Sequence, residues 1–401
     1  AYFAGAGAEG YSGIYGFGSQ PNIRAIFVKN GHLPRTGEVL KQPQLAQTLR
    51  EIAAGGAKAF YSGRIAHTIV RESYKHGGML APDDFKRYNV EERLPIHCSY
   101  RGYDLISAPP PSSGGVTLCE TLNILSGFPL SSWGWNSVQS AHYVVEAERR
   151  TYADRNTYLG DPAFVSNPIS QLLSLRYADK LRATIDPEKA TPSVQVHPGL
   201  GAVAHEGENT THFSIVDRWG NAVAVTYTVN DWFGARVIAG DTGFFLNDGM
   251  DDFTVKPGVP NMYGLVQDVR NTIEPGKRAL SSMTPTIVTK DGKLYMVTGS
   301  PGGSRIITIV LSTIQNTIDY GMNVQQAVNA PRVHMQWLPD EIQYEPGAFS
   351  YPTIDALKKM GYSFKEITVW GSAEAIVKDP KTGAYYGGSD RRHAAGSAAG
   401  Y

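Results

Sequence analysis

The stretch ENTTHFSIVDRWGNAVAVTYTVNDWFG, which begins at Glu208, constrains the fold more than any other part of the chain. Residues 210–216 and 222–229 are rich in β-branched and aromatic residues, and the segment between them has the composition of a turn. A hairpin with this loop pairs 216 with 222, 214 with 224, 212 with 226 and 210 with 228. Because side chains alternate along a strand, the two polar faces coincide and Thr210 lies opposite Thr228. The spacing alone also fits an ordinary half-exposed hairpin with threonine pairs.

Charge and cysteine content exclude several classes of protein. The 401 residues carry 37 basic and 37 acidic side chains, so nothing indicates binding to nucleic acid. No apolar run reaches 18 residues, and we therefore expect a soluble globular chain without a membrane span. Cys98 and Cys119 are too few for a disulfide framework, and we expect two reduced, half-buried thiols. The histidines are dispersed and neither HExxH nor CxxC occurs, so no metal and no cofactor are predicted.

Three regions follow one another along the chain. Residues 1–22 are glycine-rich and of low complexity, and the absence of an initial Met suggests a processed or incomplete start. Residues 23–209 alternate short strands and helices and end in an aperiodic stretch, 186–207, which we expect to be a mobile surface segment. Residues 210–401 are rich in strands, with helices predicted at 304–318, 323–330 and 352–360.

A glycine-rich loop, GSPGGSR, lies between a strand-like segment and an apolar helix and ends at Arg305. It has some likeness to a phosphate-binding loop but lacks the GK[ST] ending, so that signal is weak. A glycine-rich turn from strand to helix also presents backbone N–H groups to a developing negative charge. An oxyanion hole requires the same arrangement.

Several long motifs, in their order and spacing, resemble the gamma-glutamyltranspeptidases of the bacterial periplasmic type. These motifs are PPPSSGG, TTHFSIVDRWGNAVAVTYTVN, NDGMDDF, KPGVPNMYGL, KRALSSMTPTIV, TGSPGGSRIITIVL and NAPRVHMQWLPDE. The resemblance runs from about Ala25 to the C-terminal SAAGY. It implies an N-terminal-nucleophile hydrolase of the α+β class, folded as an αββα four-layer sandwich and exported to the periplasm or secreted. Self-cleavage between Asn209 and Thr210 would give a large-subunit portion, 23–209, and a small catalytic subunit, 210–401.

The resemblance also implies a role for each candidate site residue. Thr210 would be the nucleophile, first on the Asn209 carbonyl and later on the substrate, with its freed α-amine as general base. Thr228 would orient Thr210, and two glycines, Gly302 and Gly303, would form the oxyanion hole. The remaining residues would hold or cover the glutamyl head group: Asn230 and Asp252 at its ammonium, Ser281 and Ser282 at its α-carboxylate, and Tyr263 on a lid loop. Without the resemblance, NDGMDDF fits a solvated acidic turn and the serine pair a helix cap.

The implied activity is hydrolysis or transfer of γ-glutamyl groups through a threonine acyl-enzyme. The donor would be glutathione or a similar compound, and the acceptor would be water, an amino acid or a peptide. Two alternatives remain from the sequence. One is a related acylase, for example one acting on a β-lactam side-chain amide, and the other is a non-catalytic or incomplete binding relative.

Three departures from the family pattern bear on the head group. The family's N-terminal quarter, with an arginine in a DxREMAP-like stretch that clamps the α-carboxylate, is absent, and nothing in the chain replaces that motif. Gly249 stands where Gln or Glu is usual, and Ala279 replaces a proline. We expect weaker recognition of the head group and uncovered sheet edges and apolar faces. A further polypeptide would complete the fold and bring an arginine towards Ser281 and Ser282.

Overall fold

The computed structural model describes residues 20–29, 31–32, 34–35, 37–199, 210–231, 233–257, 259, 268–368, 371–393 and 396–400. They belong to two compact units, one drawn from 1–92 and 231–248 and the other from 93–230 and 249–401. Each unit therefore contains residues from both sides of position 209. The two compact units therefore do not correspond to the predicted processing halves, 23–209 and 210–401. Those halves stay a prediction.

The first unit is helical in its described part. Its helices are α1 (Pro21–Phe27), α2 (Pro43–Tyr61), α3 (Arg64–Lys75) and α4 (Pro82–Lys86). The apolar residues Ile65 and Ile69 of α3 are buried in one cluster with Ala239. The Asn22 amide donates to the Ile238 carbonyl at 2.7 Å, so α1 is tied to the segment 231–248.

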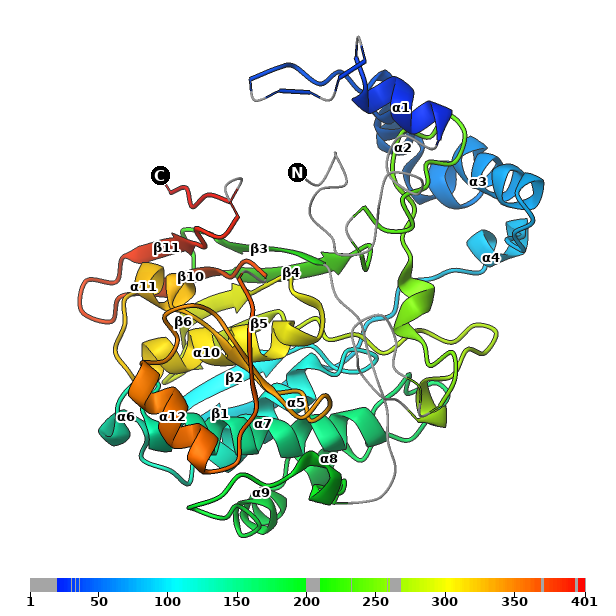
Figure 1. Cartoon of the computed structure of the whole chain (residues 1–401). Coiled ribbons are helices and arrows are strands. Elements are labelled where there is room, and N and C mark those ends of the chain that lie inside the picture. Colours follow the sequence, from blue (N-terminus) through cyan, green and yellow to red (C-terminus); the bar gives the residue numbers. More distant parts are fainter. Residues whose placement is uncertain are drawn as a thin grey trace. The chain divides into compact units, whose positions relative to one another are not determined.

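The second unit is built on an antiparallel six-stranded sheet in the order β1-β2-β5-β6-β10-β11. Its strands are β1 (Ile96–Tyr100), β2 (Tyr103–Ser107), β5 (Thr286–Lys290), β6 (Lys293–Gly299), β10 (Glu374–Lys378) and β11 (Tyr385–Ser389). Helices α5 (Gly114–Leu125), α7 (Val138–Tyr158) and α10 (Ile306–Ile318) cover one face of this sheet (Figure 1). Every residue of α5 is buried, including the polar Thr117, Glu120 and Thr121, so neighbouring elements cover this helix on all sides.

Smaller elements complete the second unit. They are α6 (Leu130–Trp133), α8 (Ile169–Leu172), α9 (Leu175–Arg182), α11 (Val324–Asn329), α12 (Tyr351–Lys359), a small sheet of β7 (Val333–His334), β8 (Ile342–Tyr344) and β9 (Phe364–Glu366), and the 3₁₀ turns η2 (Ser193–Gln195), η3 (Gly249–Asp252), η4 (Val269–Asn271) and η5 (Gly303–Arg305). The three helices predicted in the C-terminal half are confirmed as α10, α11 and α12. Among the described helices, none has the length and apolar character needed to cross a bilayer.

The hairpin of β3 (Thr210–Val216) and β4 (Ala222–Thr228) lies over the other face of the six-stranded sheet (Figure 1). Its register pairs 210 with 228 and 216 with 222, which confirms the register predicted from the sequence. Helices, a sheet and a second pair of strands thus follow one another in layers. The predicted α+β class is confirmed.

One face of this hairpin is apolar and open to solvent. Phe213 and Ile215 of β3 are exposed, as are Val223 and Tyr227 of β4. Exposed apolar patches on folded proteins are typical of surfaces that contact another polypeptide, a ligand or a membrane. The prediction of uncovered apolar faces is therefore confirmed for the described chain.

The prediction of two reduced thiols is wrong. Cys98 of β1 and Cys119 of α5 form a disulfide, with their Cα atoms 5.8 Å apart. The packing of α5 against β1 brings the two residues together, and a separation of 21 residues in the sequence gave no sign of that contact. A cross-link of this loop length stabilises a fold by roughly 3 kcal/mol.

The described part of the expected surface segment, 186–199, is largely exposed, but it is anchored to the core at Ser193. Ser193 is fully buried and its backbone N–H donates to Asp340 Oδ2 at 2.7 Å. The Trp337 indole donates to the Ser193 carbonyl at 2.8 Å. Aperiodic sequence can pack by such individual polar contacts, which a search for periodicity does not detect. Residues 200–207 lie outside the described chain.

Two carboxyl groups meet in the core between α5 and α7. Burial raises the pKa of Glu120 well above its usual value, and the neighbouring Asp154 carboxylate raises it further. Burial also raises the pKa of Asp154, while hydrogen bonds, including those from the Tyr177 hydroxyl and the Gly199 N–H, favour its ionised form. The proton shared by this pair is therefore held by Glu120.

Glu120→Gln should flatten the pH dependence of stability. The folded chain keeps a proton on Glu120 that the unfolded chain releases above about pH 4.3, so the free energy of unfolding should fall as pH rises towards the raised pKa. The variant should lose up to about 1.4 kcal/mol per pH unit of that slope in urea unfolding between about pH 5 and 8. Glu188→Gln, at an exposed position, is the control. Equal slopes for the parent and both variants would show that Glu120 is ionised when folded.

Candidate active site

The pair of threonines predicted from the hairpin register is present. Thr210 Oγ1 donates to Thr228 Oγ1 across the two strands at 3.3 Å. Thr228 Oγ1 also accepts from the backbone N–H of Asn230 at 2.9 Å. The Thr228 oxygen is thus fixed by the main chain that follows β4, and the Thr210 hydroxyl is directed by it.

A buried histidine supports the same face of the hairpin. His212 contacts Thr226 Oγ1 at 2.8 Å and Ser214 Oγ at 3.0 Å through its two ring nitrogens. Burial lowers the pKa of His212 to about 4, so the ring is neutral near pH 7. It also lies directly against Gly299, where an added Cβ would be 2.3 Å from the ring. His212 therefore packs β3 against the end of β6 as a neutral spacer.

The glycine loop after β6 has the backbone shape that only glycine adopts without strain. Gly302 has φ 140° and Gly303 has φ 59°. A Cβ on Gly302 would lie 2.8 Å from Ile309 Cδ1 of α10. The loop ends in η5, whose first residue, Gly303, lines one cavity together with Thr210 and Thr228. Backbone N–H groups of such a loop can stabilise an oxyanion.

Residues 371–373 pack against this glycine loop. Gly371 is so close that a Cβ there would lie 2.5 Å from the Pro301 carbonyl oxygen. The Ser372 N–H donates to Ser300 Oγ at 3.3 Å. The position of the glycine loop therefore depends on what holds residues 371–373.

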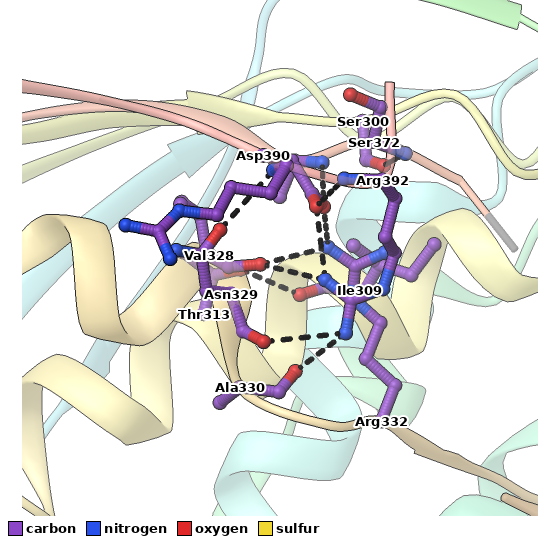
Figure 2. A network of polar contacts seen from close by, with 12 residues as sticks. Ser300, Ile309, Thr313, Val328, Asn329, Ala330, Arg332, Ser372, Asp390 and Arg392 are labelled. Carbon is purple, nitrogen blue, oxygen red and sulfur yellow. Dashed lines mark hydrogen bonds and ion pairs between the residues drawn. The ribbon is translucent and has the colours of Figure 1, made fainter. Parts of the chain in front are cut away.

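An ion-pair network holds that segment (Figure 2). The Ala373 N–H donates to Asp390 Oδ2 at 2.9 Å, and Arg392 Nη1 donates to Asp390 Oδ1 at 2.9 Å. Arg332 also pairs with Asp390, and Arg392 pairs with Glu345. Burial by itself would raise the pKa of Asp390, but the two arginines hold it below its usual value. The carboxylate is thus ionised and can accept from the main chain that supports the glycine loop.

The other predicted residues come together in the same cavity. This cavity is small, and it is lined by Thr210, Thr228, Asn230, Asp252, Ser281, Ser282, Gly303 and Ile306. Asn230 has φ +70°, so the main chain turns sharply after β4. Asp252 ends η3 and is buried. Asn209 and Tyr263 lie outside the described residues, so their predicted roles stay predictions.

The loop PPPSSGG fixes the serine pair. The Ser113 N–H and hydroxyl both donate to the Ser281 carbonyl, at 2.6 and 2.7 Å. The Ser281 N–H donates to the Pro111 carbonyl at 2.7 Å. Gly114 allows this approach, because a Cβ there would lie 2.4 Å from the Met283 carbonyl oxygen. The motif is therefore a structural support for Ser281 and Ser282.

The motif that carries the family's clamping arginine is absent, but an arginine of this chain lies beside the serine pair. Arg155 of α7 is fully buried, and its guanidinium donates to Ser282 Oγ at 3.1 Å and to Ser113 Oγ at 2.9 Å. A guanidinium cannot accept, so the Ser282 oxygen is the acceptor in its contact with Arg155. The sequence pattern did not predict this role, because Arg155 is one of several charged residues on a predicted amphipathic helix. The only sequence feature that points to Arg155 is its position near the end of a long helix, and many residues without a role in a site share that feature.

Gly371→Ala should cost more stability than Gly292→Ala. Both glycines have similar positive φ, 60° and 70°, but a Cβ on Gly292 meets nothing within 4 Å, whereas one on Gly371 would lie 2.4 Å from Ile309 Cδ1. We expect about 1–2 kcal/mol for Gly292→Ala from backbone strain alone. Overpacking should add about 1–3 kcal/mol for Gly371→Ala in urea unfolding. Equal losses would mean that residues 371–373 do not press on the glycine loop.

Comparison with known proteins gives a consistent result. The profile of the family described as gamma-glutamyltranspeptidase matches residues 8–401. A glutathione hydrolase proenzyme from Pseudomonas sp. (strain A14) is 52% identical over 388 residues, which cover 95% of this chain and 67% of that protein. The corresponding proenzyme of Escherichia coli (strain K12) is 48% identical over 380 residues, with 95% and 65% covered.

A solved structure matches over most of the chain as well. The cephalosporin acylase from Bacillus halodurans superimposes with a TM-score of 0.79 at 30% identity, covering 92% of this chain and 64% of that one. The chain thus spans about two thirds of the length of the relatives it matches.

Proposed function

The chain belongs to the gamma-glutamyltranspeptidase family, and from that premise we propose that its gene product is a glutathione hydrolase and γ-glutamyltransferase. Thr210 Oγ1 attacks the γ-carbonyl of the donor, an ester to the γ-glutamyl group forms, and the donor's amine leaves with a proton. Water, or the amino group of an amino acid or peptide, then takes the acyl group and regenerates the hydroxyl. The mature active protein is a large and a small subunit produced by self-cleavage between Asn209 and Thr210.

The observation that carries this proposal is the 3.3 Å contact between Thr210 and Thr228 at the wall of the cavity. A threonine that begins a chain supplies its own base, because a free α-amine has a pKa of about 7.7 to 8.0. Thr228 orients the attacking oxygen, and the N–H groups of Gly302 and Gly303 receive the oxyanion. Losing one such donor typically costs about 3–4 kcal/mol in the transition state.

The same cavity suits an amino-acid head group. Asn230 and Asp252 supply oxygens for an ammonium group, and Ser281 and Ser282 supply hydroxyl protons for a carboxylate. Arg155 supports the assignment of Ser282 as a donor. Its buried guanidinium donates to the Ser282 oxygen, so the Ser282 hydroxyl proton points away from Arg155. Tyr263 would close the cavity as part of a lid loop.

The related acylase is the second candidate. The similarity to a cephalosporin acylase and the presence of Gly249 in place of a polar residue favour it. The two activities differ in whether the donor's α-amine matters, so we would compare p-nitroaniline release from γ-glutamyl-p-nitroanilide and from glutaryl-p-nitroanilide. A transferase should strongly prefer the first, an acylase should accept the second, and a binding relative should release no chromophore from either.

The disulfide bears on where the protein works. Cys98–Cys119 joins a strand to a buried helix, and structural disulfides persist mainly in oxidising compartments. A periplasmic or secreted location therefore suits this chain. The exposed apolar face of the hairpin suits a polypeptide partner from the same gene product, in addition to the small-molecule donor and acceptor.

Thr210→Ala should abolish maturation. Without the hydroxyl, the Asn209 carbonyl meets no nucleophile, so the precursor should stay a single band on a denaturing gel. The parent should give a second fragment whose N-terminal sequence begins TTHFS. A Thr210→Ala protein that is still cut at this bond would exclude Thr210 as the nucleophile.

Thr228→Ala should slow both maturation and turnover by about 10-fold, because removing one oriented hydrogen bond costs about 1–1.5 kcal/mol. Gel time courses and p-nitroaniline release measure the two rates. Thr211→Ala is the matched control, since Thr211 is a neighbouring threonine on the exposed side of β3. Similar rates for the two variants would exclude an orienting role for Thr228.

A further inference from the structure

The head-group cavity is assembled from separate segments of the chain, and two of them carry Asp252 and the serine pair. Asp252 comes at the end of η3, and Ser281 with Ser282 comes almost 30 residues later, just before β5. Nothing in the order of the sequence fixes the distance between the carboxylate of Asp252 and the two hydroxyls. A substrate that carries an ammonium and a carboxylate on one carbon needs that distance to be constant.

One buried side chain connects the two segments. Asn271 Nδ2 donates to the backbone carbonyl of Asp252 at 2.7 Å, and Asn271 Oδ1 accepts from the backbone N–H of Leu280 at 2.9 Å. Asn271 and Leu280 are both completely buried. The amide thus spans from the main chain of Asp252 to the residue immediately before Ser281.

The main chain of Asn271 strengthens the connection on the Asp252 side. The Thr254 N–H donates to the Asn271 carbonyl at 2.9 Å, and Thr254 and Thr272 form a parallel bridge. The residue before Asn271 is also held, because the Arg270 guanidinium donates to the Ser166 carbonyl at 2.9 Å. Asn271 is therefore held in place by its own neighbours, so its side chain can act as a fixed spacer.

The chemistry of the amide suits this task. An asparagine side chain carries a donor and an acceptor a fixed distance apart, so it can bind a carbonyl and an N–H at once. Alanine can bind neither, and an ionised aspartate can only accept. Because the site is buried, a group left without its partner loses a full hydrogen bond and water does not replace it.

We propose that Asn271 is a positioning residue that sets the spacing between the ammonium and carboxylate subsites. Through that spacing it selects ligands that carry both charges on one carbon. The inference rests on the proposed γ-glutamyl specificity. Asn271 itself touches no reacting atom, and it acts through Asp252 and the serine pair. A displacement of the order of 1 Å between two binding groups is enough to lose much of their joint effect.

The experiment uses the mature enzyme from the complete gene product and measures three competitive inhibitors of γ-glutamyl-p-nitroanilide hydrolysis. L-Glutamate carries both charges, 4-aminobutyrate lacks the α-carboxylate, and glutarate lacks the ammonium. For Asn271→Ala we expect the inhibition constant of L-glutamate to rise about 10-fold. The constants of the two single-headed inhibitors should change less than about 3-fold, since each needs only one subsite. KM for the donor should rise more than kcat falls.

Asn271→Asp refines the result. It keeps the size of the side chain and an acceptor for the Leu280 N–H but loses the donor to the Asp252 carbonyl. We expect the same selective loss as for Asn271→Ala. Asn123→Ala is the matched control, because Asn123 is a buried asparagine of α5 whose amide donates to the Leu173 carbonyl at 3.0 Å, outside the cavity. Its three inhibition constants should match those of the parent.

Equal weakening of all three inhibitors, or no weakening by either Asn271 variant, would overturn the inference. A loss that is also seen with Asn123→Ala would likewise overturn it, because it would reflect general destabilisation. Failure of the proposed function itself looks different. In that case the parent enzyme would release no p-nitroaniline from the γ-glutamyl donor.

Discussion

The cross-strand contact of Thr210 with Thr228 is the constraint on which the rest of the site depends. A slip of one residue in the hairpin would move every side chain of a strand to its opposite face. Thr210 would then face solvent and Phe213 would face the six-stranded sheet. The register is held by the pairing itself and by His212, whose neutral ring fits against Gly299. The hairpin is thus fixed against β6, from which the glycine loop also starts.

Neutral groups line much of the cavity, and charged groups lie one layer behind them. Hydroxyls of Ser281 and Ser282 and the backbone of Gly303 face the space, while Arg155 lies behind the serines. The Asp390 network lies behind the glycine loop in the same way (Figure 2). Buried charges with full sets of partners are rigid, because moving one group would leave another unpaired. They hold the neutral donors in one orientation, which is what a site for a short-lived anion requires.

The sequence predicted what depends on local pattern and missed what depends on contacts between distant segments. The hairpin register followed from alternation and loop length, and α10, α11 and α12 from apolar periodicity. Arg155 reaches Ser282 across 127 residues of sequence, and no local pattern marks such a contact. The Cys98–Cys119 bond was misjudged for the same reason, since two cysteines carry no information about whether a strand and a helix will pack together. Ser193 was assigned to a mobile segment because its contacts are single hydrogen bonds to residues near 340.

The motifs brought Asp252, Ser281 and Ser282 into one predicted site, but only by resemblance, because their spacing in sequence does not specify their distance in space.

Helix α5 shows how these distant contacts act together. Its first residues follow the loop that carries Ser113 against the Ser281 carbonyl, and Cys119 in its middle is bonded to β1. At its other end, the Arg101 guanidinium donates to the Ser126 carbonyl at 2.9 Å and pairs with Asp319 after α10. A helix held at its start, middle and end cannot shift along its axis without breaking one of these contacts. The serine pair therefore has a position fixed relative to the sheet, and the sheet carries the glycine loop and supports the hairpin with Thr210. The distance between Thr210 and the serine pair is thus determined by the core of the unit.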